Sequence, residues 1–515
     1  MFIFIRIENC LLSATRIKCG NNKCNKNIKE SFHLAKLLKS DCKANKNHTD
    51  CSMWPLSVFV RLLSMVGPPE PVRKLYPCVV CFNNETINDM PKKRLIIIGG
   101  GFAGLNLAKH VDKKMWDVVI IDRNNYHSFP PLLYQVASSG LEPASICFPL
   151  RRELNGRRFR GATYRMGSVK SIDVAARTVS TQFETLIYDS LVIAAGTTNN
   201  FFGIADLEKH VYTIKSAPEA IRCRNEVLDR LERASLCDDP ARRRSLLTFV
   251  VVGGGASGVE IAGALGEMKR FVIKREYPAI NPDEVRVVIV EGTDALLRSM
   301  GPRSSADALD GLRQLCVEVQ LGKTMKSYAD RIATFADGST IETDTVIWTA
   351  GVTGVPIEIT GADIVPARGN RWAVDECHRL VGADGVYAIG DIALMVTGDY
   401  PHGHPQVAQV ALQQGENLAR NLSRPEREPR PFKYHDKGSM ATIGRNRAVV
   451  DMGRTHLSGR LAWWAWLFVH LMSLVGFRNR AVVFINWMWN YWTFSTGLRL
   501  LMRPQRYPVR NYWNE

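Results

Sequence analysis

The chain contains one pattern of strand, glycine turn and helix twice, and this repeat constrains its fold more than any other feature. In the first copy an apolar run at 95–98 leads into Gly-Gly-Gly-Phe-Ala-Gly at 99–104. In the second copy the run 247–252 leads into Gly-Gly-Gly-Ala-Ser-Gly at 253–258. Glycines at this spacing permit a tight turn, close approach of the backbone to a pyrophosphate and close packing of helix on strand. The sequence therefore predicts two dinucleotide-binding units in one α/β chain.

Each copy continues to a second apolar strand that ends in an acidic residue. The first of these strands ends at Asp122 and the second at Glu291. A carboxylate at this position accepts hydrogen bonds from ribose hydroxyls. It also repels a 2′-phosphate, so Glu291 favours NADH over NADPH, while Arg298 close by in the sequence leaves a contact with a 2′-phosphate open.

Three further segments resemble those of a flavin enzyme in which the chain crosses between nucleotide domains. Residues 188–196 and 345–351 each form an apolar run that ends in a small-residue turn, and 385–391 ends in Gly-Asp. We expect Asp391 near the ribityl chain of FAD, just before a helix whose N-terminus faces the flavin. The candidate cofactor-binding residues are Gly99, Gly101, Phe102, Ala103, Gly104, Asp122, Arg123, Ala195, Gly196, Gly253, Gly255, Gly258, Glu291, Ala350, Gly351, Gly390, Asp391 and Gln409.

Positive charge is concentrated at the two ends of the chain. Of the net charge of +17 over 515 residues, residues 1–89 contribute 13 basic and 7 acidic side chains and residues 437–515 contribute 11 and 2. The long middle part is nearly neutral. A nucleic-acid-binding enzyme normally carries positive charge on its working face, so the distribution argues against a nucleic-acid partner and favours an anionic lipid surface.

Residues 1–89 show no sustained helical or strand period, and we assign them no domain. Seven of the twelve cysteines lie here, and Cys78 and Cys81 form one CxxC pair with no matching second pair at zinc-finger spacing. An added Cys-rich zinc or redox module competes with sequence upstream of the true start. Because Met90 opens a Met-Pro-Lys-Lys-Arg segment that leads straight into a strand, we predict a start-site extension. We expect no metal site.

Two apolar, tryptophan-rich runs occur near the end of the chain. They span 461–477 and 481–494, with Arg478-Asn479-Arg480 as the expected break, and six of the eleven tryptophans lie between 463 and 492. As a helix the first run is about 25 Å long, which is marginal for crossing a bilayer. Tryptophans next to apolar residues and flanking arginines are typical of helices in the lipid headgroup region. We predict a membrane-associating helical segment; a buried dimerisation hairpin is the alternative.

Five motifs together resemble one enzyme family. They are Asp-Arg-Asn-Asn-Tyr-His at 122–127, Pro-Leu-Leu-Tyr-Gln-Val-Ala at 131–137, Gly-Val-Glu at 258–260, Ala-Gln-Val-Ala-Leu-Gln-Gln-Gly at 408–415 and Asp-Lys-Gly-Ser-Met-Ala-Thr-Ile-Gly at 436–444. Over about residues 93–515 the sequence resembles a type II NADH dehydrogenase, the single-chain, non-proton-pumping NADH:quinone oxidoreductase. The resemblance implies FAD in the first unit, NADH in the second and a quinone reached from the membrane. It also implies a homodimer on the cytoplasmic face of the inner membrane.

The same resemblance implies roles for four catalytic candidates. Glu260 takes the place of a glutamate near nicotinamide and flavin that handles protons or charge. Gln409 and Gln413 resemble the glutamines of the quinone site, one at the flavin and one in the tunnel. Lys437 takes a place at the flavin or quinone edge. Without these roles, Glu260 would be a carboxylate on a helix surface and Lys437 a member of a surface ion pair.

The expected organisation has three parts after the leader 1–89. An FAD-binding domain spans 90–210 and 345–435, an NADH-binding domain spans 211–344, and a membrane-anchoring region spans 436–515. The implied reaction passes a hydride from NADH to FAD and then two electrons to a quinone. It requires positioning and electrostatics rather than metal chemistry.

Two alternatives stay open on the sequence alone. A sulfide:quinone oxidoreductase needs cysteines at the flavin, for which Cys147 and Cys377 are the candidates. An NADH-responsive flavoprotein sensor would form a long-lived reduced state without quinone turnover. A disulfide reductase is excluded, because residues 105–115 after the first glycine turn contain no cysteine.

Overall fold

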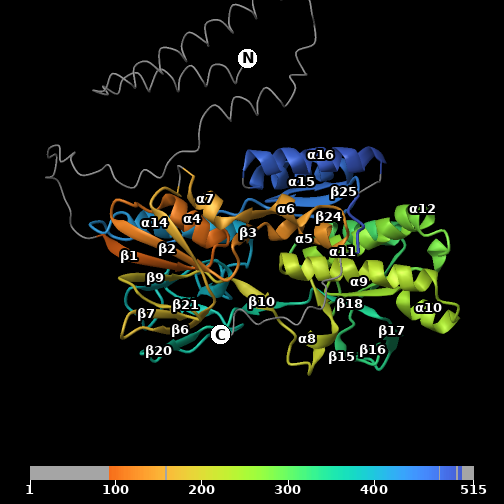
Figure 1. The fold of residues 1–515 in the computed structure, drawn as a ribbon, viewed down its shortest axis with the longest axis horizontal. Helices are drawn as coiled ribbons and strands as arrows, with labels where there is room; N and C mark the ends of the chain where they lie inside the picture. The colour runs from red at the N-terminus through yellow and green to blue at the C-terminus, as the bar shows by residue number, and fades with distance from the viewer. Residues whose placement is uncertain (1–91, 157–158, 475, 494–496, 502–515) are drawn as a thin grey trace, which may run out of the picture. The chain divides into compact units, whose positions relative to one another are not determined.

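The computed structural model describes residues 92–156, 159–474, 476–493 and 497–501. The predicted start-site extension, 1–89 with its CxxC pair, lies outside the described residues, as do Arg503, Arg506 and Arg510. Two five-stranded sheets, each parallel throughout, organise the described part of the chain (Figure 1). The predicted fold class, with two Rossmann-like units followed by a helical C-terminal segment, is confirmed.

The first sheet has the strand order β22-β9-β1-β2-β5. Its strands are β1 (Lys93–Ile98), β2 (Trp116–Asp122), β5 (Ala162–Met166), β9 (Ser190–Ile193) and β22 (Val386–Ala388). Its central strands are buried on both faces, which explains their continuous apolar runs. Helix α4 (Phe102–His110) follows β1, and α14 (Ala408–Leu422) packs against α4. The N-terminus of α14 is thereby brought to the carboxyl edge of this sheet, where nucleotides bind in folds of this kind.

The second sheet has the order β11-β18-β12-β13-β14. Its strands are β11 (Tyr212–Thr213), β12 (Thr248–Val252), β13 (Arg286–Val290), β14 (Val317–Gln320) and β18 (Thr345–Trp348). Because β18 pairs in parallel with β12, the predicted domain boundary before residue 345 is wrong by one strand. The segments 188–193 and 345–348 look alike in sequence, and only strand pairing decides the sheet to which each belongs.

The chain passes between the two sheets along a short antiparallel ribbon. β10 (Thr197–Asn199) follows the first sheet, and β19 (Val352–Gly354) returns from the second. Thr197 pairs with Gly354, and Asn199 pairs with Val352. Both crossings therefore belong to one hydrogen-bonded element.

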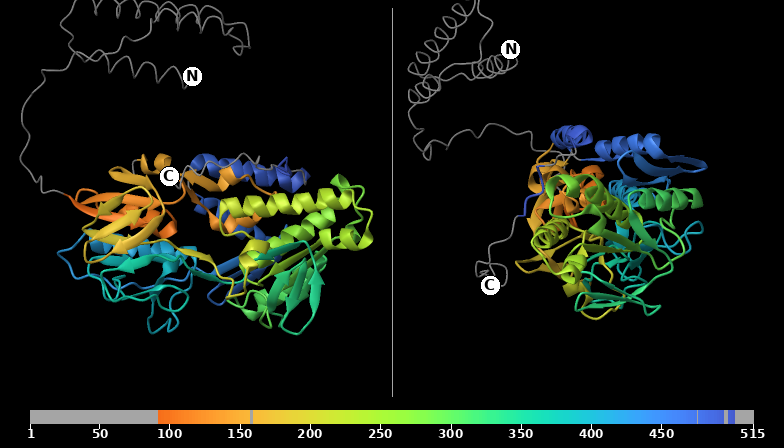
Figure 2. Two further views of the ribbon diagram at one scale, coloured as in Figure 1. Left: turned by 60° about the horizontal axis from the view of Figure 1, so that its bottom comes forward. Right: turned by 90° about the vertical axis from the view of Figure 1, so that its right-hand side faces the viewer.

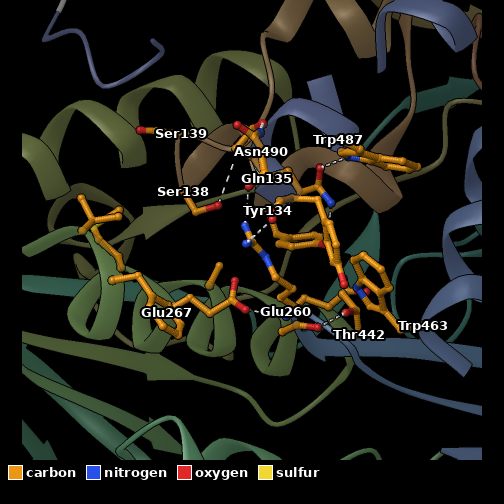
Figure 3. Close-up of a pocket in the computed structure, with 18 of the residues that line it drawn as sticks. Tyr134, Gln135, Ser138, Ser139, Glu260, Glu267, Thr442, Trp463, Trp487 and Asn490 are labelled. Carbon is orange, nitrogen blue, oxygen red and sulfur yellow. Dashed lines mark hydrogen bonds between the residues drawn. The ribbon is translucent and has the colours of Figure 1, made fainter. Parts of the chain in front are cut away.

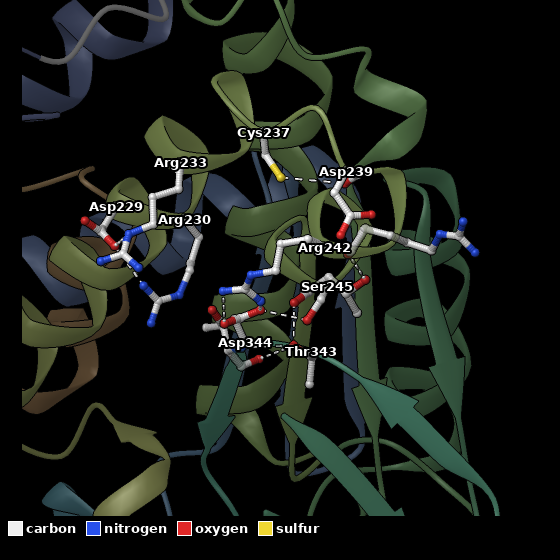
Figure 4. Close-up of polar contacts among 12 residues, drawn as sticks. Asp229, Arg230, Arg233, Cys237, Asp239, Arg242, Ser245, Thr343 and Asp344 are labelled. Atoms are coloured by element: carbon white, nitrogen blue, oxygen red, sulfur yellow. Dashed lines mark hydrogen bonds and ion pairs between the residues drawn. The ribbon is translucent and has the colours of Figure 1, made fainter. Parts of the chain in front are cut away.

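A polar cluster fixes the far end of the second sheet, where its strands begin. Helix α10 (Pro240–Leu246) supplies Arg242 and Ser245, and both side chains bond Asp344 at the start of β18 (Figure 4). The Arg242 guanidinium donates to both carboxylate oxygens of Asp344, and the distance from its Nη2 to Oδ1 is 2.8 Å. The Thr343 hydroxyl donates to the Thr248 carbonyl at 2.5 Å. The cluster ties β12 and β18 together on the side away from their carboxyl ends.

The region after residue 436 begins with a sheet, a feature that the sequence analysis missed. β24 (Ser439–Gly444), β25 (Arg447–Met452) and β26 (Thr455–Ser458) form an antiparallel meander. β24 packs on α11 (Ala256–Glu267), the helix after the second glycine turn. This meander joins the C-terminal helices to the second unit.

Helices α15 (Gly459–Ser473) and α16 (Phe477–Thr493) follow the meander and lie beside one another (Figures 1 and 2). The break predicted at residues 478–480 is wrong, since α16 already contains them. Asn479 instead donates to the carbonyls of Ala144 and Ser145, which attaches the start of α16 to α6 (Pro143–Ile146).

One face of the α15–α16 pair is buried and the other is exposed. Trp466 is fully buried in the core shared with the second unit. The exposed face carries large apolar side chains: Leu461, Trp464, Phe468, Val469, Met472, Phe484, Ile485, Trp489 and Trp492. Within the described ranges, every helix is too short or too polar to span a bilayer.

The remaining elements are local additions to the two sheets. The short helices are α5 (Leu133–Ala137), α7 (Leu150–Leu154), α8 (Leu207–His210) and α12 (Lys274–Glu276), and the longer ones are α9 (Ala217–Ser235) and α13 (Pro302–Gln314). A π-helical segment, Met268–Ile273, continues α11. The 3-10 turns are Pro130–Leu132, Pro282–Glu284 and Gly390–Ile392. The minor strands are β3 (Tyr126–Ser128), β4 (Cys147–Pro149), β6 (Val169–Asp173), β7 (Thr178–Thr181), β8 (Thr185–Ile187), β15 (Met325–Ala329), β16 (Ile332–Phe335), β17 (Thr340–Glu342), β20 (Glu358–Thr360), β21 (Trp372–Val374) and β23 (Ala393–Met395).

Candidate functional site

The first glycine turn is shaped as a cradle at the N-terminus of α4. A Cβ on Gly99 would lie 2.3 Å from the Ala194 carbonyl oxygen, and one on Gly104 would lie 2.0 Å from the Gly99 carbonyl oxygen, so both positions need glycine. At Gly101, by contrast, no atom lies within 4 Å of the Cβ position, and no side chain caps the helix. Free N–H groups facing open space at a helix N-terminus fit a pyrophosphate.

Asp122 lies beside this cradle, at the end of β2. Its carboxylate accepts hydrogen bonds from the backbone N–H groups of Gly100 and Asn124, both at 2.7 Å. Burial raises the pKa of Asp122, and these two hydrogen bonds act in the opposite direction. The neighbouring Arg123 is exposed. The backbone of the glycine turn therefore holds the Asp122 carboxylate in place, and its contact with a ribose stays a prediction.

Two further residues shape the wall of the first cradle. Phe102, the first residue of α4, packs edge-on against His127, with ring centroids 5.3 Å apart. His127 is buried, and its Nδ1 lies 2.9 Å from the Gly100 carbonyl oxygen. The predicted site residues omitted His127, although it stands in one of the five family motifs.

The second glycine turn repeats the same construction. A Cβ on Gly253 would lie 2.8 Å from the Ala350 backbone nitrogen, and one on Gly258 would lie 1.8 Å from the Gly253 carbonyl oxygen. The Cβ position of Gly255 is open, and this residue begins α11 without a side-chain cap. Glu291 accepts from the N–H groups of Gly254 at 2.5 Å and Thr293 at 2.8 Å. Arg298 is paired with Asp294, with a distance of 2.8 Å between Nη1 and Oδ1.

The predicted crossing turns lie between the strands and the ribbon. Ala195 and Gly196 connect β9 to β10, and Gly196 has a φ of +70°. Ala350 and Gly351 connect β18 to β19, and a Cβ on Gly351 would lie 2.5 Å from the Phe202 ring. Each pair thus stands at the carboxyl end of one sheet.

Gly390 and Asp391 meet the start of α14. The Gly390 N–H donates to Oε1 of Gln414 at 2.7 Å, and a Cβ on Gly390 would lie 3.1 Å from Cβ of Ala103. Asp391 accepts a hydrogen bond from the Thr197 hydroxyl at 3.3 Å. Gln414 is fully buried and was absent from the predicted set; three glutamines lie within six residues, and only the packing of α14 on α4 shows which one faces Gly390.

Gln409 and Gln413 both hold the segment 435–438. Gln409 donates to the Gly438 carbonyl and accepts from the Lys437 N–H, both at 3.0 Å. Gln413 donates to the His435 carbonyl and accepts from the His435 N–H, both at 2.9 Å. The Lys437 side chain is exposed. Three of the four catalytic candidates therefore form one cluster at the N-terminal half of α14, and this cluster leads directly into β24.

Glu260, the fourth candidate, points into a cavity instead of lying on a helix surface. It is 7% exposed, and burial raises the pKa of its carboxyl well above the ordinary value, against a hydrogen bond from the Thr442 backbone. The cavity, of about 180 Å³, lies between α5, α11, β24 and the C-terminal helices (Figure 3). Trp463, Trp466 and Trp487 line it on the side of α15 and α16. A buried carboxyl group with a raised pKa thus faces a space walled by aromatic rings.

A hydrogen-bonded chain joins this cavity to α16. The Gln135 side-chain Nε2 donates to the Tyr134 hydroxyl at 2.8 Å, and the Trp487 indole N–H donates to the Gln135 side-chain Oε1 at 2.9 Å. Tyr134 and Gln135 belong to the motif at 131–137, and Trp487 belongs to the second apolar run. Both segments could be recognised in the sequence, but nothing in it indicated that Trp487 bonds Gln135. The chain fixes α16 against the cavity wall.

Comparison with known proteins places this arrangement in a family. Residues 93–415 match the family described as pyridine nucleotide-disulphide oxidoreductase, and residues 436–493 match the NDH2 C-terminal domain. The type II NADH:quinone oxidoreductase Ndh of Mycobacterium tuberculosis is 34% identical over 421 residues, which cover 77% of this chain and 87% of that protein. The chain belongs to the type II NADH:quinone oxidoreductase family.

Two further relatives agree with this assignment. An internal alternative NAD(P)H-ubiquinone oxidoreductase A1 of Solanum tuberosum mitochondria is 30% identical, covering 78% of this chain and 87% of that protein. The solved structure of NDH2 from Plasmodium falciparum in complex with NADH has the same fold, with a TM-score of 0.73 and 21% identity, over 80% of this chain and all of that one.

As a member of the type II family, the chain is an NADH:quinone oxidoreductase with FAD as its flavin cofactor, which confirms the predicted activity and cofactors. The sulfide-oxidising alternative is not favoured. Burial raises the pKa of Cys147 to about 11 and also raises that of Cys377, whose thiol contacts the Pro429 carbonyl at 3.7 Å. Neither thiol is predisposed to the thiolate form that sulfur chemistry needs.

Proposed function

We propose that the first cradle holds FAD, that the second holds NADH, and that the quinone head group enters the cavity at Glu260 from the side of α15 and α16. The open N-termini at Gly101 and Gly255 support the two nucleotide positions. The Glu291 carboxylate supports NADH over NADPH. When bound, FAD accepts a hydride from NADH and returns two electrons to a quinone.

The observation that carries the quinone position is the buried acid in an aromatic-walled cavity. The raised pKa favours the protonated form of Glu260, which can donate a hydrogen bond or a proton to a quinone oxygen. The tryptophans of α15 and α16 exclude water from the apolar part of a quinone. Together the acid and the tryptophans suit a ligand that has one polar end and one apolar end.

The cluster on α14 has a positioning role in this proposal. Gln409 and Gln413 fix the backbone of 435–438, and this segment continues into β24, whose Thr442 backbone bonds Glu260. The amides thereby connect the flavin-side helix to the acid in the cavity. Lys437 lies on the same segment, and we propose that its ammonium group faces the flavin or quinone edge when both are bound.

We also propose that the exposed face of α15 and α16 rests on an anionic lipid surface. That face is apolar, and it belongs to the strongly basic C-terminal region. Quinone would then leave the lipid directly above the cavity. The predicted homodimer and the predicted location on the cytoplasmic face of the inner membrane remain part of this proposal. Light scattering on the FAD-loaded protein measures its molar mass and so tests the homodimer.

Rapid mixing tests the quinone position. Glu260→Gln keeps the shape of the side chain and removes the acid, so flavin reduction by NADH should be retained while reoxidation by a soluble quinone slows at least about tenfold. Gln409→Ala should also slow reoxidation. Wild-type reoxidation in Glu260→Gln would refute the cavity as the quinone site.

A further inference from the structure

A second carboxyl group, that of Glu267, lines the same cavity as Glu260. The two residues are separated by seven positions on α11, which is about two turns or 10 Å along one face of the helix. Glu267 is partly exposed, whereas Glu260 is buried. One face of α11 therefore presents two acids to the cavity (Figure 3), of which Glu260 is buried and Glu267 is partly exposed.

The turn between β24 and β25 holds the Glu267 carboxyl firmly. The backbone N–H of Arg445 donates to its Oε1. A Cβ on Gly444 would lie 3.1 Å from the same oxygen, so the carboxyl rests directly against the backbone of this turn. The Arg445 guanidinium donates to the carbonyls of Asn490 at 2.8 Å and Tyr491 at 3.1 Å. The position of Glu267 is thus tied to the docking of α16.

The charged and titratable neighbours set Glu267 apart from Glu260. Burial raises the pKa of Glu267, while the charges of Arg445 and Arg447 act in the opposite direction. At Glu260, only a hydrogen bond from the Thr442 backbone lowers the pKa. The other titratable groups that line the cavity are Tyr134 on α5, Tyr491 on α16 and Arg499. Positive charge therefore opposes protonation of Glu267 and has no counterpart at Glu260, which favours passing a proton from Glu267 toward an ionised Glu260.

Tyr134, on α5, lines the same cavity as the two acids of α11. Burial raises the pKa of its phenol far above the ordinary value, and the charges of Glu260 and Glu267 raise it further, so both carboxyls act on this hydroxyl. The Tyr134 oxygen accepts from Gln135, which leaves its own hydrogen for donation into the cavity. The phenol stays neutral and can pass a proton by accepting one and giving another.

The reaction defines what such groups must supply. NADH, a quinone and one proton give NAD+ and a quinol, so each turnover draws one proton from water. An acid that protonates the quinone becomes a carboxylate in an apolar site, and it must be recharged before the next turnover. A route between the buried acid and solvent is therefore needed.

Building on the proposed quinone site, we infer that Glu267 is the residue through which this proton enters. The Glu267 O–H bond breaks as its proton passes to the Tyr134 oxygen, the Tyr134 proton passes to the Glu260 carboxylate, and water reprotonates Glu267. The cavity has room for water molecules that bridge the remaining gaps. No electrons move along this route, so it leaves hydride transfer from NADH untouched.

Glu267→Gln in the FAD-loaded enzyme tests the inference by rapid mixing at several pH values. Flavin reduction by NADH should keep its wild-type rate. Reoxidation by a soluble quinone should slow at least about tenfold at pH 8, regain speed toward pH 6, and be rescued by added formate, because a small weak acid replaces the lost carboxyl. The solvent deuterium isotope effect on reoxidation should rise.

Control variants separate this role from others. Glu284→Gln removes an exposed carboxylate of the same unit, paired with Arg243, and should behave as wild type. Glu267→Asp should keep the wild-type pH profile. Wild-type reoxidation in Glu267→Gln, with slow reoxidation in Glu260→Gln, would overturn the relay alone. Wild-type reoxidation in both variants would overturn the quinone site itself. Loss of FAD or a slowing of both half-reactions, without formate rescue, would show a structural role and overturn the relay.

Discussion

The carbonyl oxygen of Ile443 in β24 lies against the backbone of Gly263 in α11, where a Cβ on the glycine would stand 1.9 Å from it. This contact brings the C-terminal meander onto the helix that carries Glu260 and Glu267. The backbone of neither element can give way without disturbing the cavity. The meander is therefore as much a part of the site as the glycine turns are.

Gly263→Ala should accordingly destabilise the protein. The added methyl group meets backbone and not a flexible side chain, and we expect a loss of about 3 kcal/mol in the free energy of unfolding. Urea denaturation measures this. Gly398→Ala is the control, since no atom lies within 4 Å of its Cβ position. Equal midpoints for the two variants would contradict the close contact.

Gly101→Ala and Gly255→Ala should separate the two nucleotide sites. Both Cβ positions are open in the protein, so stability should be unchanged, but each methyl group would project where a pyrophosphate approaches. We expect Gly101→Ala to lose FAD on gel filtration. Gly255→Ala should keep FAD and raise KM for NADH about tenfold, a free-energy change of about 1.4 kcal/mol. Loss of FAD in Gly255→Ala and a raised KM for NADH in Gly101→Ala would instead place FAD at the second turn and NADH at the first.

Glu291→Gln should relax the discrimination between NADH and NADPH. The amide oxygen can still accept the Gly254 N–H, although the Thr293 N–H loses its acceptor, and the negative charge that repels a 2′-phosphate is gone. We expect the ratio of kcat/KM for NADH over NADPH to fall at least about tenfold, measured by flavin reduction. An unchanged ratio would mean that other groups set the preference.

Asp344→Asn should destabilise the protein in a pH-dependent manner. Burial alone would raise the pKa of Asp344, but hydrogen bonds from Arg242 and Ser245 outweigh it and hold the pKa below its ordinary value of 3.8. The stabilisation is therefore complete above pH 3.8 and is lost as the pH falls through the lowered value. We expect the variant to unfold at lower urea than wild type at pH 7, with the gap narrowing toward pH 3. A gap that is independent of pH would assign the loss to packing.

Phe468→Ser combined with Ile485→Ser should weaken binding to vesicles that contain phosphatidylglycerol. Both side chains are about two-thirds exposed on the α15–α16 face, at 66% and 62%. Burying each in lipid contributes about 1.5–3 kcal/mol, so binding should fall at least about tenfold in co-sedimentation. Ile187→Ser with Leu236→Ser removes apolar side chains that are at least as exposed but lie away from these helices, and this variant should bind as wild type.

Local sequence patterns predicted both glycine turns, the acidic strand ends and the two C-terminal helices, because each depends on residues close together in the chain. Contacts between segments far apart in the chain determined the features that local patterns did not predict. The strand at 345–348 joined the second sheet through its pairing with β12. Gln414 proved to bond Gly390 only once α14 was packed on α4. The cavity around Glu260 combines segments from residue 134 to residue 499, a separation that no short motif encodes.

The paired strands β10 and β19 determine how one nucleotide-binding unit can move against the other. Two separate linkers would let the distance between the units vary freely, whereas a hydrogen-bonded ladder from Thr197 with Gly354 to Asn199 with Val352 resists stretching and shear. Two-stranded ribbons also accommodate a wide range of twist between their strands. We therefore expect the two units to rotate about the β10–β19 ribbon at a nearly constant separation. NADH and NAD+ could then exchange at the second unit while the first unit keeps its flavin bound.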